Sequence, residues 1–511
     1  MKIISNLFVS TALLALSSWG VVKQPNIIIY IVDDLGVMDS SAPFLADKDG
    51  NPVRHPLNDH YRTPNLERLA ESGIRFSQFY AQSVCSPSRT SLLNGQNATR
   101  HGTTQWIKPT ENNRGEFGPS QWNWEGFKEN DFTIQAHLQS IGYQTIHIGK
   151  AHFGPLGHHA EIPTNIGFDV NIGGASWGRP ASYYAANQYG NLMKGKPNTM
   201  HAVPHLEKYY ESGEFLTEAL TLEANDQIEK ASQSGKPFFM HLSQYAVHSP
   251  FDSDPRFAAN YAQSKLNKRE QAFATLVEGV DHSLGQVIEK VKSLGIGEET
   301  IIFYLGDNGT DSPTGGHHEI GAAAPLRGKK ATEMEGGMRA PLLASWVQPN
   351  PNNEMQKAFP IKSGAMQPQV AAIMDLVPTI LDLTDSGAKV PSDHIIDGTS
   401  LKTQLSGTRN ESRDDTFLMH FPHKHRGSYF TVYREGDWKV IYQYLPEVCK
   451  IKKRYRLYNL ADDLSESNDL APSMPEKVNE LMGKMIQRLN EENALYPEKN
   501  GKELRPQLMK F

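Results

Sequence analysis

The chain has 511 residues, of which 38% are hydrophobic and 21% are charged, with 41 glycines, 31 prolines and 2 cysteines. This ordinary globular composition argues against an extended disordered chain, a collagen-like repeat and a small disulfide-stabilised scaffold. The formal net charge of −6, without a block of basic residues, argues against a protein that binds nucleic acid or an anionic membrane.

Residues 1–20 have the residue order of a secretory signal peptide. Lys2 precedes an apolar run from Leu7 to Leu16, and the small residues Ser17, Ser18 and Gly20 follow it. This order is typical of a cleaved signal, although an uncleaved anchor fits the same pattern. The run is shorter than the roughly 20 residues that cross a bilayer, and no other segment is as apolar. The sequence therefore predicts an exported protein, periplasmic or secreted, without a membrane span.

Predicted strands and helices alternate from residue 26 onward. Residues 26–32 form a continuous β-branched and apolar run, as in a strand buried on both faces of a parallel sheet. Thr63 and Pro64 fit the N-cap and the first position of a helix. Further helices are predicted over 133–141, 217–234 and 267–294, and further strands over 143–148, 238–242 and 300–305. This alternation indicates a doubly wound α/β sheet, in which ligands bind beyond the carboxyl ends of the strands.

The pattern changes after about residue 383. Short alternating runs over 417–420, 429–433, 438–442 and 456–459 precede an amphipathic helix from about 475 to 492. Such runs predict a smaller antiparallel sheet with a terminal helix. We therefore divide the chain into an N-terminal unit over 24–400 and a C-terminal unit over 401–511.

Acidic and amide side chains follow two of the predicted strands. Asp33 and Asp34 come directly after the first strand, and Asp307 and Asn308 follow the strand over 300–305. Either pair alone fits a turn or a helix cap. Because both pairs stand at equivalent ends of a parallel sheet, their like charges need a cation between them. Carboxylate and amide oxygens are hard ligands, so this group suits Ca²⁺ or Mg²⁺ rather than zinc.

Cys85 begins the segment Cys85-Ser-Pro-Ser-Arg89. Pro87 suits the first turn of a short helix and Gly95 the position after its end, which puts Cys85 at the positive end of that helix. Backbone N–H groups there favour anions and lower the pKa of a thiol. Alternatively, Cys85 is a small buried hydrophobe or forms a disulfide with Cys449. The Pro, Ser and Arg around it favour a functional role.

Cationic side chains follow other strands. Lys150 and His152 come directly after the strand over 143–148, and His248 follows the strand over 238–242 after a short polar connection. A further run of cationic residues ends at Lys330, which lies five residues before Glu335. A single Lys or His in a loop is usually solvated or structural. Several cations beyond one sheet edge, facing a divalent metal, instead describe a pocket for a small oxyanion such as sulfate or phosphate.

Together these motifs resemble those of the type I sulfatases of the alkaline phosphatase superfamily. The segment from Cys85 to Gly95 is similar to the family signature Cys-x-Pro-Ser-Arg-x-x-x-Leu-x-Gly, and the other motifs occur in the family's order. The resemblance covers the chain from about residue 26 to the end, including 436–439 and 457–460 of the C-terminal unit. It implies a large mixed, mostly parallel sheet flanked by helices, followed by a smaller antiparallel sheet with a helix. The implied activity is sulfate ester hydrolysis on a sulfated poly- or oligosaccharide, as in bacterial carbohydrate sulfatases.

The resemblance also implies a role for each site residue. A separate maturation enzyme oxidises Cys85 to formylglycine (3-oxoalanine), whose hydrate attacks the sulfur of the ester. The implied site for Ca²⁺ or Mg²⁺ consists of Asp33, Asp34, Asp307, Asn308 and the modified Cys85. The implied catalytic group consists of Lys150 and Lys330 as sulfate ligands, Arg89 orienting the hydrate, His248 as the acid for the leaving alcohol and His152 as the base that expels sulfate. Lys329 stands where the family often has glycine, and the spacing to Glu335 favours Lys330 over it.

Candidate contacts to the sugar lie outside these motifs. They are Ser176, Arg179, His318 and His423, and Trp177 is placed to stack on a sugar ring. The alternative is that these loops carry packed or solvated side chains. Two other functions also remain open, namely a phosphoester or phosphonate ester hydrolase of the same superfamily and a catalytically silent, Ca²⁺-stabilised carbohydrate-binding protein. A two-zinc phosphatase would need more His ligands, and no proposed catalytic position is missing here.

Overall fold

The computed structural model describes residues 23–193, 195–198, 200–449 and 452–510. The predicted signal peptide over 1–20 lies outside the described residues. Within the described ranges, none of the helices combines the length and the apolar character needed to cross a membrane.

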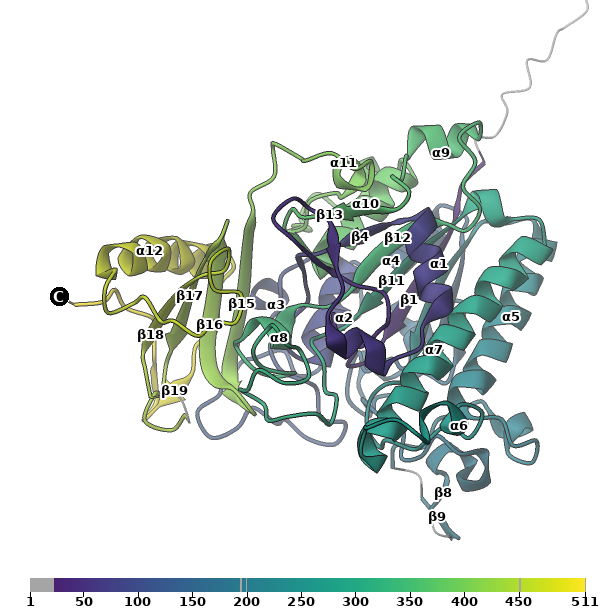
Figure 1. Ribbon diagram of the computed structural model, residues 1–511, viewed down its shortest axis with the longest axis horizontal. Helices are drawn as coiled ribbons and strands as arrows, with labels where there is room; N and C mark the ends of the chain where they lie inside the picture. Colours follow the sequence, from purple (N-terminus) through teal and green to yellow (C-terminus); the bar gives the residue numbers. More distant parts are fainter. Residues whose placement is uncertain (1–22, 194, 199, 450–451, 511) are drawn as a thin grey trace, which may run out of the picture.

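An eight-stranded sheet forms the centre of the larger part of the molecule (Figure 1). Its strands, in order across the sheet, are β13 (Ala365–Gln367), β4 (Ile74–Phe76), β12 (Leu342–Trp346), β11 (Thr300–Gly306), β1 (Asn26–Val32), β10 (Phe238–Gln244), β6 (Gln144–Gly149) and β7 (Val170–Ile172). β12 is antiparallel to β11 and β4, whereas the other neighbouring pairs are parallel. The carboxyl ends of β1, β6, β10 and β11 therefore meet at one edge.

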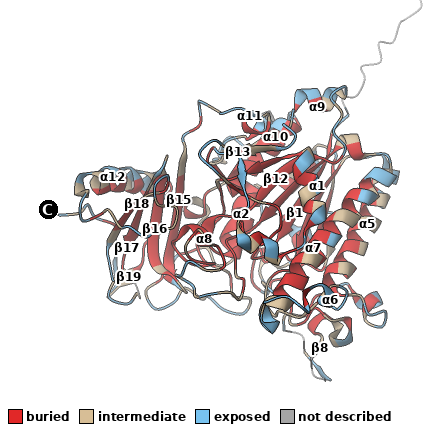
Figure 2. Cartoon of the chain, in the orientation of Figure 1, coloured by how far each residue is buried: buried red, intermediate tan, exposed pale blue. Residues whose placement is uncertain are grey.

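Helices cover both faces of this sheet because successive side chains of a strand point to opposite faces. Ile28, Tyr30 and Val32 of β1 pack in one core cluster, and Ile27, Ile29 and Ile31 pack in the other. The first cluster is closed by α1 (Pro64–Ser72), α5 (Leu216–Ser234) and α7 (Lys268–Ser293). The second is closed by α2 (Cys85–Asn94), α4 (Ile134–Ser140) and α10 (Leu376–Leu383). Figure 2 shows the resulting buried layer between the helices.

Local sequence signals explain where several of these helices begin. The Asn267 side chain accepts hydrogen bonds from the backbone N–H groups of Arg269 and Glu270, and the Glu270 carboxylate accepts from the N–H of Asn267, which completes a capping box for α7. Thr63 precedes α1 as predicted, but its side chain does not cap the helix and pairs instead with the hydroxyl of Ser41 at 2.8 Å. Predicted boundaries thus agree with the structure even where the capping bond differs.

A second sheet lies beside the first one (Figure 1). Its antiparallel strands are β15 (Thr416–Lys424), β16 (Ser428–Glu435), β17 (Trp438–Gln443) and β18 (Tyr455–Asn459). α12 (Pro475–Glu491) packs on one face through Leu481, Met482 and Met485. The other face packs on the larger part, where Phe417 meets Tyr80 at 4.6 Å between ring centroids. The predicted architecture of two sheets is confirmed, whereas the division at 400/401 stays a prediction.

Short elements complete the fold. The short helices are α3 (Ala98–His101), α6 (Ala258–Tyr261), α8 (Glu335–Met338), α9 (Glu354–Ala358) and α11 (Lys402–Leu405). The paired two-residue strands are β2 (Leu45–Ala46) with β3 (Pro52–Val53), β5 (Phe79–Tyr80) with β14 (Ala371–Ala372), β8 (Leu192–Met193) with β9 (Lys196–Pro197), and β19 (Glu498–Lys499) with β20 (Lys502–Glu503).

Candidate active site

The predicted acidic residues meet at the carboxyl ends of the two central strands. Val32 pairs with Gly306 across β1 and β11, so Asp33 and Asp34 stand beside Asp307 and Asn308. The backbone N–H of Asp34 donates to Asp307 Oδ1 at 3.0 Å, and Asn308 Nδ2 donates to Asp34 Oδ1 at 3.0 Å. All of these side chains are fully buried. The parallel register therefore produces the cluster that the sequence predicts.

Three oxygens of this cluster have no hydrogen-bond partner among the described residues. They are Asp33 Oδ2, Asp34 Oδ2 and Asn308 Oδ1, and all are buried. A buried oxygen without a partner is costly, so such a group is stable only if something else satisfies it. Oxygen donors of this kind are the ligands that Ca²⁺ and Mg²⁺ prefer. The donor set thus fits a hard divalent cation.

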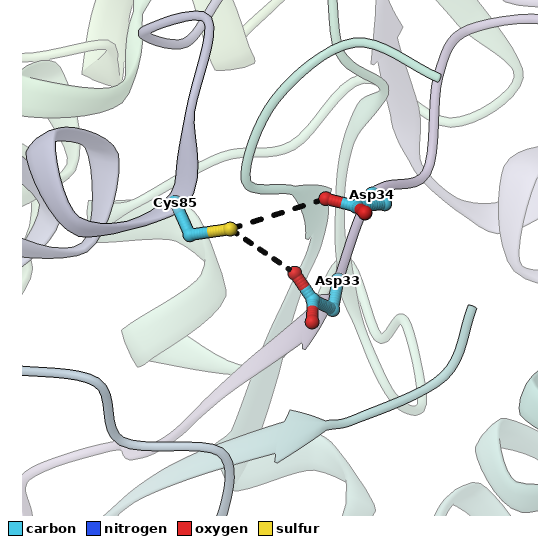
Figure 3. A group of neighbouring side chains, drawn as sticks. All are labelled: Asp33, Asp34 and Cys85. Carbon is cyan, nitrogen blue, oxygen red and sulfur yellow. Dashed lines mark hydrogen bonds between the residues drawn. The ribbon is translucent and has the colours of Figure 1, made fainter. Parts of the chain in front are cut away.

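Cys85 is the first residue of α2 and points at the two aspartates (Figure 3). Its sulfur lies 3.6 Å from Asp33 Oδ1 and 3.9 Å from Asp34 Oδ1. Burial raises the pKa of the Cys85 thiol to about 12, with Asp33 and Asp307 adding to the effect against the lysines. The expected lowering by the helix N-terminus is therefore wrong, because desolvation among carboxylates outweighs it. Both cysteines are free, so no Cys85–Cys449 disulfide forms.

Arg89 lies one turn after Cys85 on α2 and is also fully buried. Its Nε donates to Asp307 Oδ2 at 2.9 Å, and one Nη donates to the carbonyl oxygen of Lys150 at 3.0 Å and to Ser243 Oγ at 2.7 Å. Arg89 thus connects α2 to the ends of β11, β6 and β10. Sequence reasoning missed Ser243, whose signal is that the fully buried strand β10 ends in the polar residues Ser243 and Gln244.

Two lysines flank the aspartates. Lys150 Nζ lies 2.7 Å from Asp33 Oδ1, and Lys330 Nζ lies 2.5 Å from Asp34 Oδ1. Lys329 instead points to backbone carbonyls, with Nζ at 3.3 Å from the oxygens of Thr314 and Gly315. Lys330 is therefore the lysine that faces the acids, as its spacing favoured.

The pKa values of Asp33 and Asp34 are shifted in opposite directions. Burial raises the pKa of Asp33 well above its usual value, with Asp307 and Asp34 adding to the effect, although Lys150 and Arg89 oppose it. For Asp34, burial is outweighed by Lys330, His248 and Lys150, which hold the pKa of this carboxyl well below its usual range. The site accordingly holds at least one firmly ionised carboxylate between two ammonium groups.

His248 reaches the same group from the loop after β10. Its Nε2 lies 3.5 Å from Asp34 Oδ2, while Nδ1–H donates to the carbonyl oxygen of Ser249 at 2.8 Å. Burial lowers the pKa of His248 to about 3, and the two lysines oppose protonation as well. Tyr183, which sequence reasoning missed, donates to the carbonyl oxygen of His248 at 2.8 Å.

His152 lies beside this group at the end of β6, with a φ angle of 58°. Its Nε2–H donates to the carbonyl oxygen of Ile107 at 2.7 Å. Its Nδ1 is buried and has no partner among the described residues. A Cβ on Gly178 would lie 2.5 Å from the His152 ring, so glycine is required there for this close contact.

The candidate sugar contacts are dispersed. Ser176 is buried, with a hydroxyl that has no partner in the described ranges, and it lies two residues before the glycine that packs on His152. Arg179 is exposed. His318 Nε2 lies 3.5 Å from Glu333 Oε2. Both ring nitrogens of His423 are used internally, with Thr104 Oγ1 at 2.8 Å and the carbonyl oxygen of Arg114 at 3.1 Å, so His423 does not join the site.

Comparison with known proteins identifies this arrangement. A family model described as Sulfatase matches residues 25–386. N-acetylgalactosamine-6-sulfatase of Mus musculus is 31% identical over 408 residues, which cover 77% of this chain and 69% of the relative. A sulfatase of Formosa agariphila is 28% identical, with coverage of 89% of this chain and 85% of that protein.

Solved structures share the whole architecture. The crystal structure of Ps i-CgsB matches with a TM-score of 0.71 and 25% identity over 93% of this chain and 96% of that chain. The same protein in complex with k-i-k-neocarrahexaose matches with a TM-score of 0.69 and 24% identity, over the same shares of both chains. The chain therefore belongs to the sulfatase family and is a sulfuric ester hydrolase.

Proposed function

We propose that this sulfatase releases inorganic sulfate from a sulfated poly- or oligosaccharide, with a formylglycine derived from Cys85 as its reactive group and Ca²⁺, or Mg²⁺, at the acidic cluster. One observation carries the proposal. The Cys85 sulfur lies 3.6 Å from Asp33 Oδ1, and each of Asp33 and Asp34 is paired with a lysine that can also bind an oxyanion. A nucleophile position, a cation site and a sulfate site thus coincide.

The thiol itself is poorly suited to attack sulfur. Burial raises the pKa of Cys85 to about 12, so the thiolate is scarce at neutral pH. Conversion of the Cβ–Sγ group to an aldehyde, with sulfur lost as sulfide and two electrons passed to an oxidant such as dioxygen, removes this limit. We assign that conversion to a separate maturation enzyme.

The acidic cluster supports the metal assignment. Asp33, Asp34, Asp307 and Asn308 would hold the ion, because three of their oxygens are buried without a partner among the described residues. A bound divalent cation neutralises these acids and lowers the pKa of a coordinating hydroxyl.

Lys150, Lys330 and His248 serve the first step. The aldehyde hydrate carries two hydroxyls on one carbon, and one of them attacks the ester sulfur while the bond from sulfur to the sugar oxygen breaks. The two ammonium groups bind the nonbridging sulfate oxygens. Burial lowers the pKa of His248 most, and the positive charges of the two lysines lower it further. A bound sulfate ester would offset those charges and so favour the protonated imidazolium. His248 Nε2–H then protonates the leaving sugar oxygen.

His152 serves the second step. Its Nε2–H is committed to the carbonyl oxygen of Ile107, which leaves Nδ1 as a buried acceptor. Nδ1 takes the proton of the remaining hydroxyl, the bond from carbon to the sulfate oxygen breaks, and sulfate leaves as the aldehyde reforms. A serine at this position would lack the second hydroxyl and would stop at a stable sulfate ester.

Two further points support the proposed substrate and location. The Mus musculus relative is named N-acetylgalactosamine-6-sulfatase, and Ps i-CgsB has been solved in complex with k-i-k-neocarrahexaose. Residues 1–20 have the sequence of an export signal, so we place the enzyme outside the cytoplasm, where polysaccharides occur.

Mass spectrometry of the peptide that contains Cys85, taken from protein made in its native host, tests the proposal. An aldehyde in place of the thiol is expected. Finding only the thiol would overturn the mechanism. The Cys85→Ala variant should bind Ca²⁺ and unfold like the parent while releasing no sulfate, and retained turnover would show that another residue is the nucleophile.

A further inference from the structure

The hairpin between β15 and β16 brings the second sheet to the sulfate site. The backbone N–H of Gly427 at its tip donates to the carbonyl oxygen of Ala331, next to Lys330, at 2.7 Å. A Cβ on Gly427 would lie 2.8 Å from Glu333 Oε2 and 2.9 Å from that carbonyl oxygen. Glycine therefore permits this close approach, and it fixes the preceding residue, Arg426, beside the lysine that faces Asp34.

Asp311 orients the Arg426 side chain. Both terminal nitrogens of the guanidinium contact the Asp311 carboxylate, with Nη2 donating to Oδ2 at 3.0 Å. Asp311 is itself held by its backbone N–H, which donates to the carbonyl oxygen of Asp34 at 3.3 Å. A paired arginine of this kind loses little conformational freedom when it binds a ligand. Arg426 is thus preorganised by the same loop that carries Asp307 and Asn308.

Arg426 remains available to a ligand. Its side chain is 27% exposed, and Asp311 is its only side-chain hydrogen-bond partner in the described part of the chain. Although burial opposes the charge of Arg426, Asp311, Asp34 and Cys85 lie close enough to raise its pKa. The guanidinium therefore presents unused N–H donors and a full positive charge at the edge of the sulfate site.

The residue before Arg426 on the hairpin is uncharged, and the nearby acids Asp311 and Glu333 are each paired with an arginine. Burial, together with Arg426 and Lys330, lowers the pKa of His425 to about 3, so this ring is uncharged at neutral pH. Trp106 lies against it, with 6.4 Å between ring centroids. The chain as a whole carries a net charge of −6, which repels polyanions. Recognition of an anionic polysaccharide consequently depends on a few local cations such as this one.

We infer that Arg426, held by Asp311, is a specificity-determining residue that binds a second oxyanion of the substrate while Lys150 and Lys330 bind the sulfate that is cleaved. The inference rests on the proposed sulfatase function. The second oxyanion is a carboxylate or another sulfate, because a guanidinium pairs with both through parallel N–H···O bonds. Substrates with two anions are then preferred over those with one.

Three probes test the inference with the matured enzyme. They are N-acetylgalactosamine 6-sulfate, its 4,6-disulfate, and the 6-sulfate linked to glucuronate. For the Arg426→Gln variant, we expect the ratio of kcat/KM between a two-anion probe and the one-anion probe to fall about 10- to 100-fold. Arg426→Lys keeps the charge but not the parallel N–H donors of the guanidinium, so its ratio should lie between those of the parent and of Arg426→Gln. Arg505→Gln, which breaks the exposed pair with Glu503, is the matched control and should keep the parent ratio.

The arms of the experiment have distinct meanings. If the kcat/KM ratio falls for the disulfate, the group that Arg426 binds is a second sulfate. If it falls for the glucuronate-linked probe, that group is a carboxylate. The inference is overturned if the parent shows no preference for a two-anion probe, or if Arg426→Gln leaves both ratios unchanged. Calorimetric binding of the same probes to the Cys85→Ala chain, with and without Arg426→Gln, gives the ratio independently of turnover. Parent enzyme that carries the aldehyde but cleaves no sulfate ester would instead contradict the proposed function.

Discussion

The two histidines of the site are fixed through opposite ring nitrogens. His152 donates Nε2–H to the carbonyl oxygen of Ile107 and keeps Nδ1 as an acceptor. His248 donates Nδ1–H to the carbonyl oxygen of Ser249 and turns Nε2 toward Asp34. These hydrogen bonds set the tautomer of each ring, and they give each histidine a single nitrogen for proton transfer. In the proposed mechanism each ring uses this one nitrogen, Nδ1 of His152 as the base and Nε2 of His248 as the acid.

Replacing His248 with Ala should affect sugar sulfates far more than aryl sulfates. A sugar alkoxide needs a proton to leave, whereas 4-nitrophenolate leaves without one. We expect kcat/KM for a sugar sulfate to fall about 10²- to 10⁴-fold and the value for 4-nitrophenyl sulfate to fall much less. His282→Ala, at a half-exposed position on α7, is the control and should change neither. Equal losses on both substrates would contradict the acid role of His248.

At the scale of elements, the central strands and long helices were predictable because their patterns are long and regular. β1 covers the predicted residues 26–32, and α7 covers the predicted helix between its cap residues. The family resemblance implied a mixed sheet, but the residue pattern did not predict the strands beyond β11. β4 and β13 have three residues each, too few for periodicity to be visible, and the reversed direction of β12 is set by its pairing with β11 and β4.

The residues of the candidate site likewise fall into those that the sequence predicted and those that it did not. Residues that directly follow predicted strands were found because parallel strands bring their ends together. Arg426 was missed because its partner Asp311 is 115 residues away in the chain and lies in the loop after β11 of the larger sheet. Its available signal was its place three residues after His423, which the sequence indicates as a candidate sugar contact. Side-chain direction in loops, which separates Lys330 from Lys329, also depends on tertiary contacts that no local pattern records.

The end of α2 offers a test of how tightly the helix that carries Cys85 is packed. Gly95 has a φ angle of 74°, and a Cβ there would lie 3.0 Å from Val377 Cβ on α10. Gly142 has a φ angle of 100° with no atom within 4 Å of such a Cβ. Gly142→Ala should therefore lower the free energy of unfolding by about 1 kcal/mol through backbone strain alone.

Gly95→Ala adds crowding to the same strain. We expect a further loss of about 1–3 kcal/mol, because well-packed cores tolerate added methyl groups poorly. Guanidinium unfolding of both variants beside the parent measures the difference. If the two substitutions cost the same, α10 moves freely away from α2, and the position of Cys85 is then not fixed by this contact.

Across the whole molecule, buried charges join the second sheet to the loop of Lys330. Lys439 on β17 lies 2.9 Å from Glu335 Oε1 and 2.6 Å from Glu466 Oε1, and all of these side chains are fully buried. The backbone N–H of Glu335 donates to Glu466 Oε2 at 2.7 Å. Glu335 begins α8, five residues after Lys330. The two sheets thus share one ion cluster on the segment that directly follows Lys330 in the chain.

Replacing Lys439 with Met should destabilise the molecule strongly. The substitution keeps the length of the side chain but leaves two buried carboxylates without their common cation, and breaking such a pair costs about 3–5 kcal/mol. Lys453→Met removes a partly exposed pair with Asp469 in the loops that flank β18 and should change the free energy of unfolding by less than about 1 kcal/mol. Denaturant unfolding followed by tryptophan fluorescence measures both, and KM for the sulfate ester reports on Lys330. A Lys439→Met protein as stable as the Lys453→Met protein would mean that the carboxylates become protonated at no cost, and the cluster would then not hold the sheets together.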